Sequence, residues 1–475
     1  MSARAERLLM LVAPVAAMAT VALGLRLGAG NAVRAAVVQG APLSGAGTGL
    51  AWQVVVFDEE RGYREPVALP DVEVAAWQGS REVQVGGATN VDGAMEVLLP
   101  LSAPADRVEV RVGGALLAGG DVVEPAVVTR KSPATAWTRF SRREGAVVLD
   151  VAVLGQRVAT GFPATLWIHA TDTVTRGSLP GVVVEPERDE SFVPGSSSVT
   201  TDARGWARIV ATPVGHVVAV VLRARTPDGR TGVWAGGLFV SPGAAQLSVN
   251  ERVTPDEEPV LDVVVPTLRD TAYLEIDDAK GRAWAAAVPV KGAPGQMPRA
   301  TVHAPRLAPG LYWAVEAGDP VGGSLLGPGT IARPFFVAAS DIAALSYGLD
   351  ADACAPPLDP RDTARAVSVC LGIAGAAPVP RWTALEGFSM QHARDAQRRR
   401  RGLALALGGL LVAGVLEVLL LLRASVAARA KLRAQEAAVD AGPVRFVGRP
   451  WSVGVGLLVA LLGFALLAAF LGRVG

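Results

Sequence analysis

Apolar and polar residues alternate in short runs between residues 50 and 340, and this pattern predicts β-strands. The runs recur every ~8–12 residues with Gly, Pro and Asp between them, as in a β-sandwich. No apolar repeat at the helical spacing of about 3.6 residues interrupts this stretch. We therefore expect the stretch to be all-β. The strands expected at its start are residues 52–57, 72–77, 81–85, 95–99 and 108–112.

A short sequence pattern occurs twice within this region. Leu-Pro-x-Val-x-Val begins at Leu69 and again at Leu179, and Thr-Asx-x-x-Gly follows at residues 89–93 and 201–205. Thr and Asx side chains hydrogen-bond local backbone in turns, and Gly adopts positive φ without strain. The repeat predicts two tandem copies of one β module. The residues assigned to its turns are Thr89, Asn90, Asp92, Gly93, Thr201, Asp202 and Gly205.

This repeated frame resembles bacterial Ig-like and transthyretin-like modules, including carboxypeptidase regulatory-like and macroglobulin-like β-sandwiches. The resemblance covers residues 50–240, with a weaker extension to residue 340. It implies a β-sandwich fold. It implies little about function, because such modules serve as spacers, adhesive units and assembly surfaces.

Three long apolar segments lie outside the β region. Residues 8–25 follow Arg4 and Arg7 and are either a signal peptide or an uncleaved signal anchor. Residues 402–422 and 451–471 have the length and composition of transmembrane helices. These segments predict a membrane protein with α-helical spans at both ends.

The distribution of basic residues gives conflicting information on topology. The loop at 423–450 carries six basic and two acidic residues, which favours a cytoplasmic position. Residues 394–401 carry five basic residues on the other side of the first C-terminal span. The expected export of the β modules and the cysteine pair both favour an extracytoplasmic position for the β region. We therefore expect the bulk of the chain to be periplasmic or extracellular.

The pattern of segments gives a complete domain prediction. It comprises a signal anchor or signal peptide at 1–25, a linker at 26–48, β-sandwiches at 49–130, 134–242 and 245–340, a disulfide-pinned juxtamembrane segment at 341–401, a transmembrane helix at 402–422, a basic cytoplasmic loop at 423–450 and a transmembrane helix at 451–471.

Small residues share one face of the first C-terminal helix. Ala406, Gly409 and Ala413 follow one another at steps of three and four residues, and Glu417 continues the row. Such a face allows another helix to approach closely. Gly456 and Ala460 offer a matching surface on the last helix, so we expect the two helices to pack as a hairpin. Glu417 either reaches the cytoplasmic headgroups or pairs with a basic group on a neighbouring helix.

The two cysteines, Cys354 and Cys370, are 16 residues apart. In an exported protein this spacing favours a local disulfide, and the alternative is a pair of buried free thiols. A loop of this size would stabilise the fold by about 3 kcal/mol in the chain-entropy model.

Catalytic and metal-binding motifs are missing from the chain. The four histidines lack the spacing of a zinc site, and neither cysteine belongs to a Cys-Gly-Glu-Gln thioester sequence. Two acidic clusters, at residues 275–278 and 350–362, lack the frame of a calcium loop and are expected to be solvated turns. We therefore expect no enzyme activity, no cofactor and no metal.

These features favour a non-enzymatic, membrane-anchored extracytoplasmic protein that acts as a scaffold, adhesion or assembly module for a protein or glycan partner. The alternative is a subunit of a membrane signalling or transport complex, in which the C-terminal hairpin associates with partner transmembrane helices and the β modules sense an external ligand. The net charge of +1 gives no electrostatic reason to expect a nucleic-acid partner.

Overall fold

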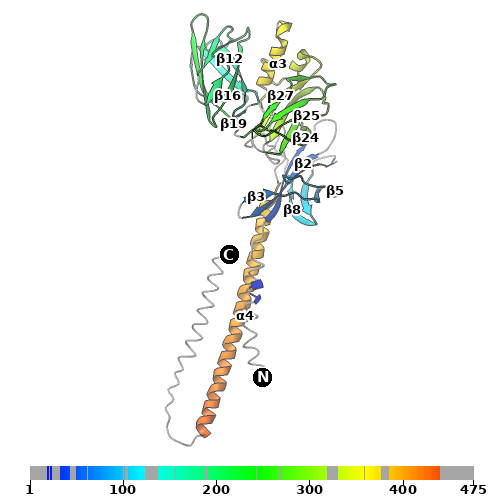
Figure 1. The fold of residues 1–475 in the computed structure, drawn as a ribbon, viewed down its shortest axis with the longest axis vertical. Helices are drawn as coiled ribbons and strands as arrows, with labels where there is room; N and C mark the ends of the chain where they lie inside the picture. Colours follow the sequence, from blue (N-terminus) through cyan, green and yellow to red (C-terminus); the bar gives the residue numbers. More distant parts are fainter. Residues whose placement is uncertain are drawn as a thin grey trace. The chain divides into compact units, whose positions relative to one another are not determined.

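The computed structural model describes residues 33–42, 50–60 and, with gaps, 63–438, together with residues 19, 20, 22 and 23 (Figure 1). It divides into two compact units. We call Ala36–Phe57 with Pro66–Glu386 the β unit, and Met1–Ala35 with Asp58–Glu65 and Gly387–Gly475 the helix unit. The gaps after residue 63 are residues 100, 102–104, 123–136, 156, 188–190, 242, 267–268, 318–329, 358 and 376–384.

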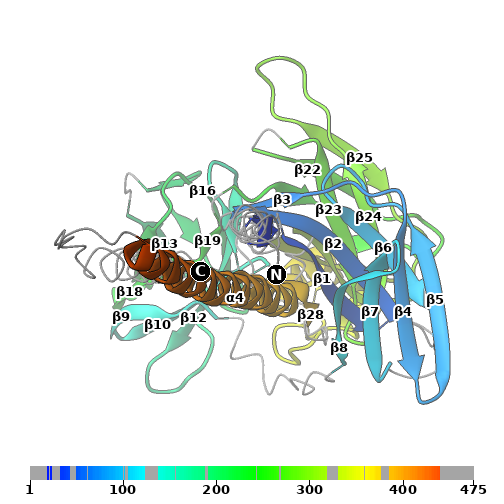
Figure 2. The same cartoon turned by 90° about the horizontal axis from the view of Figure 1, so that it is seen from below.

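Module 1 is a β-sandwich whose two sheets enclose fully buried valines such as Val54, Val56, Val72 and Val74. Alternate residues of each strand face this core, which is the reason for the alternation in the sequence. Figure 2 shows the second sheet with β8, β7, β4 and β5 side by side. The first sheet contains β1 (Val33–Pro42), β2 (Leu50–Glu60), β3 (Tyr63–Pro66), β6 (Ala94–Leu99) and β28 (Leu385–Glu386), and the second contains β4 (Val72–Gln78), β5 (Arg81–Gly87), β7 (Arg107–Val112) and β8 (Ala115–Asp121).

Two strands of module 1 differ from the sequence-based expectation. Strand β1 lies within the stretch predicted as a linker, because Ala36 and Val38 are buried in the module core, while the surrounding Gly- and Ala-rich sequence conceals their alternation. Strand β28 lies within the segment predicted as juxtamembrane and pairs antiparallel with β1, with Val37 opposite Glu386. The chain therefore returns to module 1 immediately before its last helix.

Module 2 encloses its core between two main sheets, ordered β10-β12-β16-β14 and β15-β13-β17-β18-β9. Trp234 is fully buried in this core. The strands are β9 (Phe140–Gly145), β10 (Val147–Val153), β11 (Val158–Ala159), β12 (Ala164–Asp172), β13 (Val183–Pro186), β14 (Phe192–Pro194), β15 (Val199–Thr200), β16 (Trp206–Pro213), β17 (Val218–Arg225), β18 (Thr231–Leu238) and β19 (Val240–Ser241).

Module 3 is a third sandwich, with sheets ordered β20-β22-β25 and β21-β27-β26-β23-β24. Phe335 and Ile276 are among the apolar side chains in its core. The strands are β20 (Gln246–Ser248), β21 (Arg252–Val253), β22 (Val260–Val264), β23 (Thr271–Asp277), β24 (Arg282–Pro289), β25 (Arg299–His303), β26 (Gly310–Ala317) and β27 (Ile331–Val337).

A small helical segment, residues 341–375, follows module 3, and we call it the clasp. It contains α2 (Asp341–Leu345), the 3₁₀ turn η2 (Pro360–Asp362) and α3 (Thr363–Gly372), with Cys354 and Cys370 joined in a disulfide. The Ser340 hydroxyl oxygen caps α2 by accepting a hydrogen bond from the Ala343 N–H.

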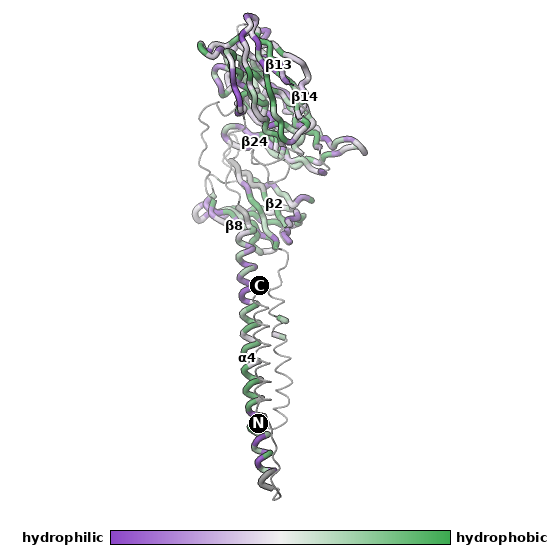
Figure 3. Tube along the Cα trace, turned by 90° about the vertical axis from the view of Figure 1, so that its left-hand side faces the viewer, coloured by the Kyte–Doolittle hydropathy of each residue, from purple (hydrophilic) through white to green (hydrophobic). Residues whose placement is uncertain are grey.

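The last described element is one continuous helix, α4 (Gly387–Ala438), of 52 residues. It begins within the predicted juxtamembrane segment and continues into the predicted loop, where no Gly or Pro interrupts residues 415–438. Among the described residues it is the one helix long and apolar enough to cross a membrane. Figure 3 shows its polar beginning and its apolar middle. The predicted second span, 451–471, and most of residues 1–25 lie outside the described residues.

Candidate functional site

The first repeated turn is stabilised by its own side chains. The Thr89 hydroxyl donates a hydrogen bond to the Val67 carbonyl oxygen (3.1 Å) and accepts one from the Leu69 N–H (2.7 Å). Asn90 Oδ1 accepts from the N–H groups of Asp92 (3.0 Å) and Ala94 (2.9 Å), which forms an Asx turn.

The second turn repeats this arrangement. The Thr201 hydroxyl donates to the Leu179 carbonyl oxygen (2.8 Å), and Asp202 Oδ1 accepts from the N–H groups of Arg204 (2.9 Å) and Trp206 (2.8 Å). Gly205 has a φ of 77°, and a Cβ there would lie 2.7 Å from the Ala170 carbonyl oxygen. The fifth position of the pattern therefore requires glycine.

The outer side chains of the first turn contact module 3. Tyr273 on β23 donates a hydrogen bond from its hydroxyl to Asp92 Oδ2 (2.6 Å) and accepts one from Asn90 Nδ2 (3.3 Å). The Tyr273 ring is buried against Val55 and Ala94 of module 1. The turn therefore docks one module onto another in addition to setting strand register.

A buried arginine continues this joint between modules 1 and 3. Arg282 on β24 is 3% exposed, and its two terminal nitrogens lie 3.2 Å from Glu96 of module 1 and 3.2 Å from Glu275 of module 3. Burial alone would lower the pKa of Arg282, but the attraction of Glu275, Glu96 and Asp277 outweighs it and raises the pKa above its usual value. Burial raises the pKa of Glu96, against the opposing attraction of Arg282.

The acidic residues of β23 are therefore not the solvated turn that the sequence suggests. Glu275 is 3% exposed and Asp277 is fully buried, because both face the Arg282 guanidinium. No group of three or more potential ligands that could hold a metal ion occurs among the described residues. This cluster of opposite charges joins two modules.

The second turn contacts the clasp in a comparable way. Asp202 Oδ2 lies 2.8 Å from the Arg365 Nε of α3, and Arg365 also donates to the Trp206 carbonyl oxygen (2.9 Å). Arg204 of the same turn donates to the carbonyl oxygens of Ala355 (2.9 Å) and Asp352. Both copies of the repeated turn are thus docking elements.

Aromatic rings support the joint between module 2 and the clasp. Trp206 is 4% exposed and stacks on His169 (ring centroids 4.4 Å apart) and on Trp137 (5.8 Å). Burial lowers the pKa of His169, so the ring is neutral at pH 7. Val369 and Ile373 of the clasp pack against the same cluster.

The clasp also packs on module 3, so it connects two modules. Its Cys370 and Leu371 share a buried cluster with Trp313, whose indole N–H donates to the Gly375 carbonyl oxygen (2.9 Å). Modules 2 and 3 meet directly where Arg333 donates to the Leu154 carbonyl oxygen (3.0 Å). Burial lowers the pKa of Arg333 to about 10.

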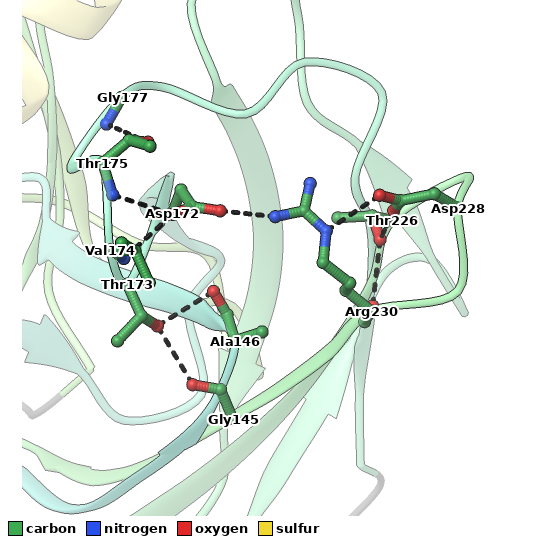
Figure 4. Close-up of polar contacts among 10 residues, drawn as sticks. All are labelled: Gly145, Ala146, Asp172, Thr173, Val174, Thr175, Gly177, Thr226, Asp228 and Arg230. Carbon is green, nitrogen blue, oxygen red and sulfur yellow. Dashed lines mark hydrogen bonds and ion pairs between the residues drawn. The ribbon is translucent and has the colours of Figure 1, made fainter.

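A separate polar network lies entirely within module 2 (Figure 4). Arg230 lies between Asp172 and Asp228 and pairs with both carboxylates. Asp172 Oδ1 accepts from the N–H groups of Val174 and Thr175, each at 2.9 Å. The network connects two loops of the same module. None of its contacts among the described residues reaches another module, so a substitution in it can serve as a control for substitutions at the joints.

We predict that Asp202→Ala loosens the clasp. It removes two turn hydrogen bonds and the pair with Arg365, which together are worth roughly 1–2 kcal/mol in a partly buried setting. Amide hydrogen exchange of α3 should accelerate. The matched control is Asp172→Ala, which removes a similar Asx turn without touching the clasp. Equal protection of α3 in both variants and the wild type would contradict the docking role.

The predicted helix-packing face of α4 contacts the N-terminal segment in the helix unit. Ala406 is 1% exposed, and a Cβ added at Gly409 would lie 2.8 Å from the Cβ of Thr20. A Cβ added at the neighbouring Gly408 would meet nothing within 4 Å. The predicted partners Gly456 and Ala460, and the side chain of Glu417, lie outside the described residues, so hairpin packing stays a prediction.

Some residues of the joints belong to no recognisable sequence motif. Tyr273, Arg282 and Arg365 occur in no motif, and their roles depend on segments more than 150 residues away in the chain. One available signal was an arginine at the start of a strand that follows two acidic positions, Glu275 and Asp277. That pattern is common on solvated hairpins and does not by itself identify a buried cluster.

No protein-family model and no curated protein sequence matches the chain. Solved structures that match part of the chain include invasin, described as a bacterial integrin-binding protein (13% identity, 64% of this chain and 60% of that chain, TM-score 0.16). They also include the Escherichia coli adhesin FdeC (14%, 65% and 97%, TM-score 0.17) and Salmonella alpha-2-macroglobulin (12%, 65% and 21%, TM-score 0.16). The chain spans 60% of the length of invasin. These likenesses concern the fold of the modules alone.

Proposed function

We propose that the protein is a membrane-anchored extracytoplasmic scaffold that presents a binding face on a rigid β unit to a protein or glycan partner. The observation that carries this proposal is the docking of both repeated turns, the first on Tyr273 and the second on Arg365. Bending at either joint would expose buried groups such as Arg282 and Trp206, so the modules hold fixed relative positions within this unit.

The binding face that we propose is the open half of a sheet in module 2. The outer surface of β12 and β16 is covered by the clasp at Trp167 and Trp206. Further along the same face, Val210 is 39% exposed, and Val193 on the edge strand β14 is 50% exposed. The same face also carries Thr165, Arg208 and Thr212, so two exposed valines lie among polar groups beside the outermost strand of the sheet. Such a mixed face beside a strand edge suits an extended peptide or a flat partner surface.

The membrane arrangement can be tested by reporter fusions after residues 345 and 436 in the full chain. The proposal requires an extracytoplasmic reporter at the first position and a cytoplasmic one at the second, because α4 lies between them. A cytoplasmic reporter after residue 345 would refute the extracytoplasmic scaffold, and the disulfide would then have no oxidising environment.

The binding face can be tested in the intact protein by Val193→Lys combined with Val210→Lys. Partner capture at the cell surface should be lost, since two charges replace exposed apolar contacts. Val174→Lys is the matched control, because Val174 is 88% exposed on a loop away from this face. Capture that is lost equally in the control, or in neither, would exclude this face.

We predict that the N-terminal segment is retained as an anchor beside α4. The cysteine pair Thr20→Cys with Gly409→Cys should form a disulfide in membranes, because these positions are in contact. Thr20→Cys with Gly408→Cys is the control and should not, since Gly408 faces open space. A mature chain that lacks residues 1–25 would rule out the anchor and leave the signal-peptide alternative.

A further inference from the structure

A pocket of about 330 Å³ lies on α4 just before its apolar stretch. Its described lining residues are His392, Asp395, Ala396, Arg399, Arg400 and Leu403. They follow one another at steps of three and one residues, so they line one side of the helix. The volume lies within the range of pockets that hold small ligands, roughly 300–1,000 Å³.

The charges of the pocket favour an anion. Its described lining residues include two arginines, Arg399 and Arg400, and one acidic residue, Asp395. Asp395 Oδ2 lies 3.0 Å from Arg399 and holds that guanidinium in place. Arg400 has no ion-pair partner among the residues that the structure describes. A guanidinium held by one carboxylate beside a second, unneutralised one is suited to a phosphate group.

The first turns of α4 are themselves fixed, which makes this side of the helix a preformed surface. Within the helix unit, Arg64 lies over the Phe388 ring (3.8 Å from its centroid), and Glu59 pairs with both Arg64 and His392 at 3.0 Å. His392 is thereby held at one end of the pocket. At the other end, Leu403 begins the apolar stretch of the helix.

This gradient from arginine to leucine matches the level of lipid headgroups at a membrane surface. It also accounts for the topological conflict in the sequence, because five basic residues on the outer side of a span oppose the positive-inside tendency. Exposed arginines at this level can bind a negatively charged group of the membrane surface. The headgroup phosphate of an anionic lipid provides such a group, and its acyl chains would continue past Leu403.

We propose that this pocket binds an anionic phospholipid of the outer leaflet, with Arg399 and Arg400 contacting its phosphate. The lipid fixes the depth at which α4 lies in the bilayer and holds the first turns of α4 at the membrane surface. The inference rests on the membrane span of the proposed function.

The test uses the full chain reconstituted in phosphatidylcholine vesicles with and without phosphatidylglycerol, then extracted and examined by native mass spectrometry for bound lipid. The wild type should retain phosphatidylglycerol. Arg399→Gln with Arg400→Gln should lower the retained fraction by roughly 25-fold, about 5-fold for each arginine near the surface. The control pair, Arg429→Gln with Arg433→Gln, removes the same charge from exposed positions further along α4 and should retain the lipid.

Three outcomes would overturn the proposal. The first is equal retention of phosphatidylglycerol by the wild type and the Arg399/Arg400 variant, and the second is equal loss in the control pair. The third is saturable binding of inorganic phosphate by the detergent-solubilised chain that prevents lipid retention, since free phosphate would then be the ligand. Carbonate extraction separately tests the span: a chain that stays in the membrane but does not select phosphatidylglycerol refutes the lipid site alone.

Discussion

Arg282→Met should lower the free energy of unfolding of the β unit by about 3–5 kcal/mol, the usual cost of removing one partner from a buried charge cluster. The substitution retains most of the side-chain volume, so the effect comes from charge. Glu275 and Asp277 are almost completely buried and would lose the guanidinium that compensates them. Glu96 of module 1 would lose the same partner, so modules 1 and 3 should separate more easily.

Chemical denaturation measures the loss in the free energy of unfolding. Amide hydrogen exchange of β6 in module 1 and of β23 in module 3 measures the loosening on each side of the joint. The control is Arg299→Met, which removes an exposed arginine from the same module and should change stability by less than about 0.5 kcal/mol. Adding Glu275→Gln to Arg282→Met should restore part of the loss, because one uncompensated carboxylate is removed. A loss in Arg282→Met no larger than in the control would show that the cluster does not hold the joint.

Glu316→Gln should raise the free energy of unfolding by about 3 kcal/mol at pH 8, from the cost of charging a buried carboxyl group. Glu316 on β26 is fully buried, and burial raises its pKa to about 7, although Arg269 at 3.3 Å partly offsets this. The folded protein therefore holds a proton that the unfolded chain has already released. Stability attributable to Glu316 is complete below the ordinary glutamate pKa and is lost as the pH rises to about 7.

The quantity to measure is the difference in unfolding free energy between Glu316→Gln and the wild type from pH 4 to pH 8. The difference should be near zero at the acid end, should grow between the ordinary glutamate pKa and about pH 7, and should level off above that pH. Glu144→Gln is the control, because it removes a carboxylate from an exposed position on β9 and not from a buried one. A difference that is independent of pH would mean that folding leaves the pKa of Glu316 unchanged and would contradict the prediction.

Arg282 and Glu316 show what a sequence-based prediction cannot supply. Alternation predicted the strands that hold Glu275 and Glu316, and the turn motif predicted the geometry around Asn90 and Asp202. Whether a charged side chain on such a strand faces water or a second module depends on how the modules pack. The sequence suggested a solvated acidic turn at residues 275–278, whereas packing buries Glu275 and Asp277 around Arg282.

The sequence by itself determined the β-sandwich modules, the two Thr-Asx-x-x-Gly turns and the apolar C-terminal helix, because each follows from local periodicity or local hydrogen bonding. Only the tertiary structure decided that β1 and β28 complete module 1 and that the clasp joins modules 2 and 3. It also decided that the two turns dock on Tyr273 and Arg365. These contacts join residues far apart in the chain. They depend on complementary shape and charge between surfaces, and one surface alone does not specify its partner.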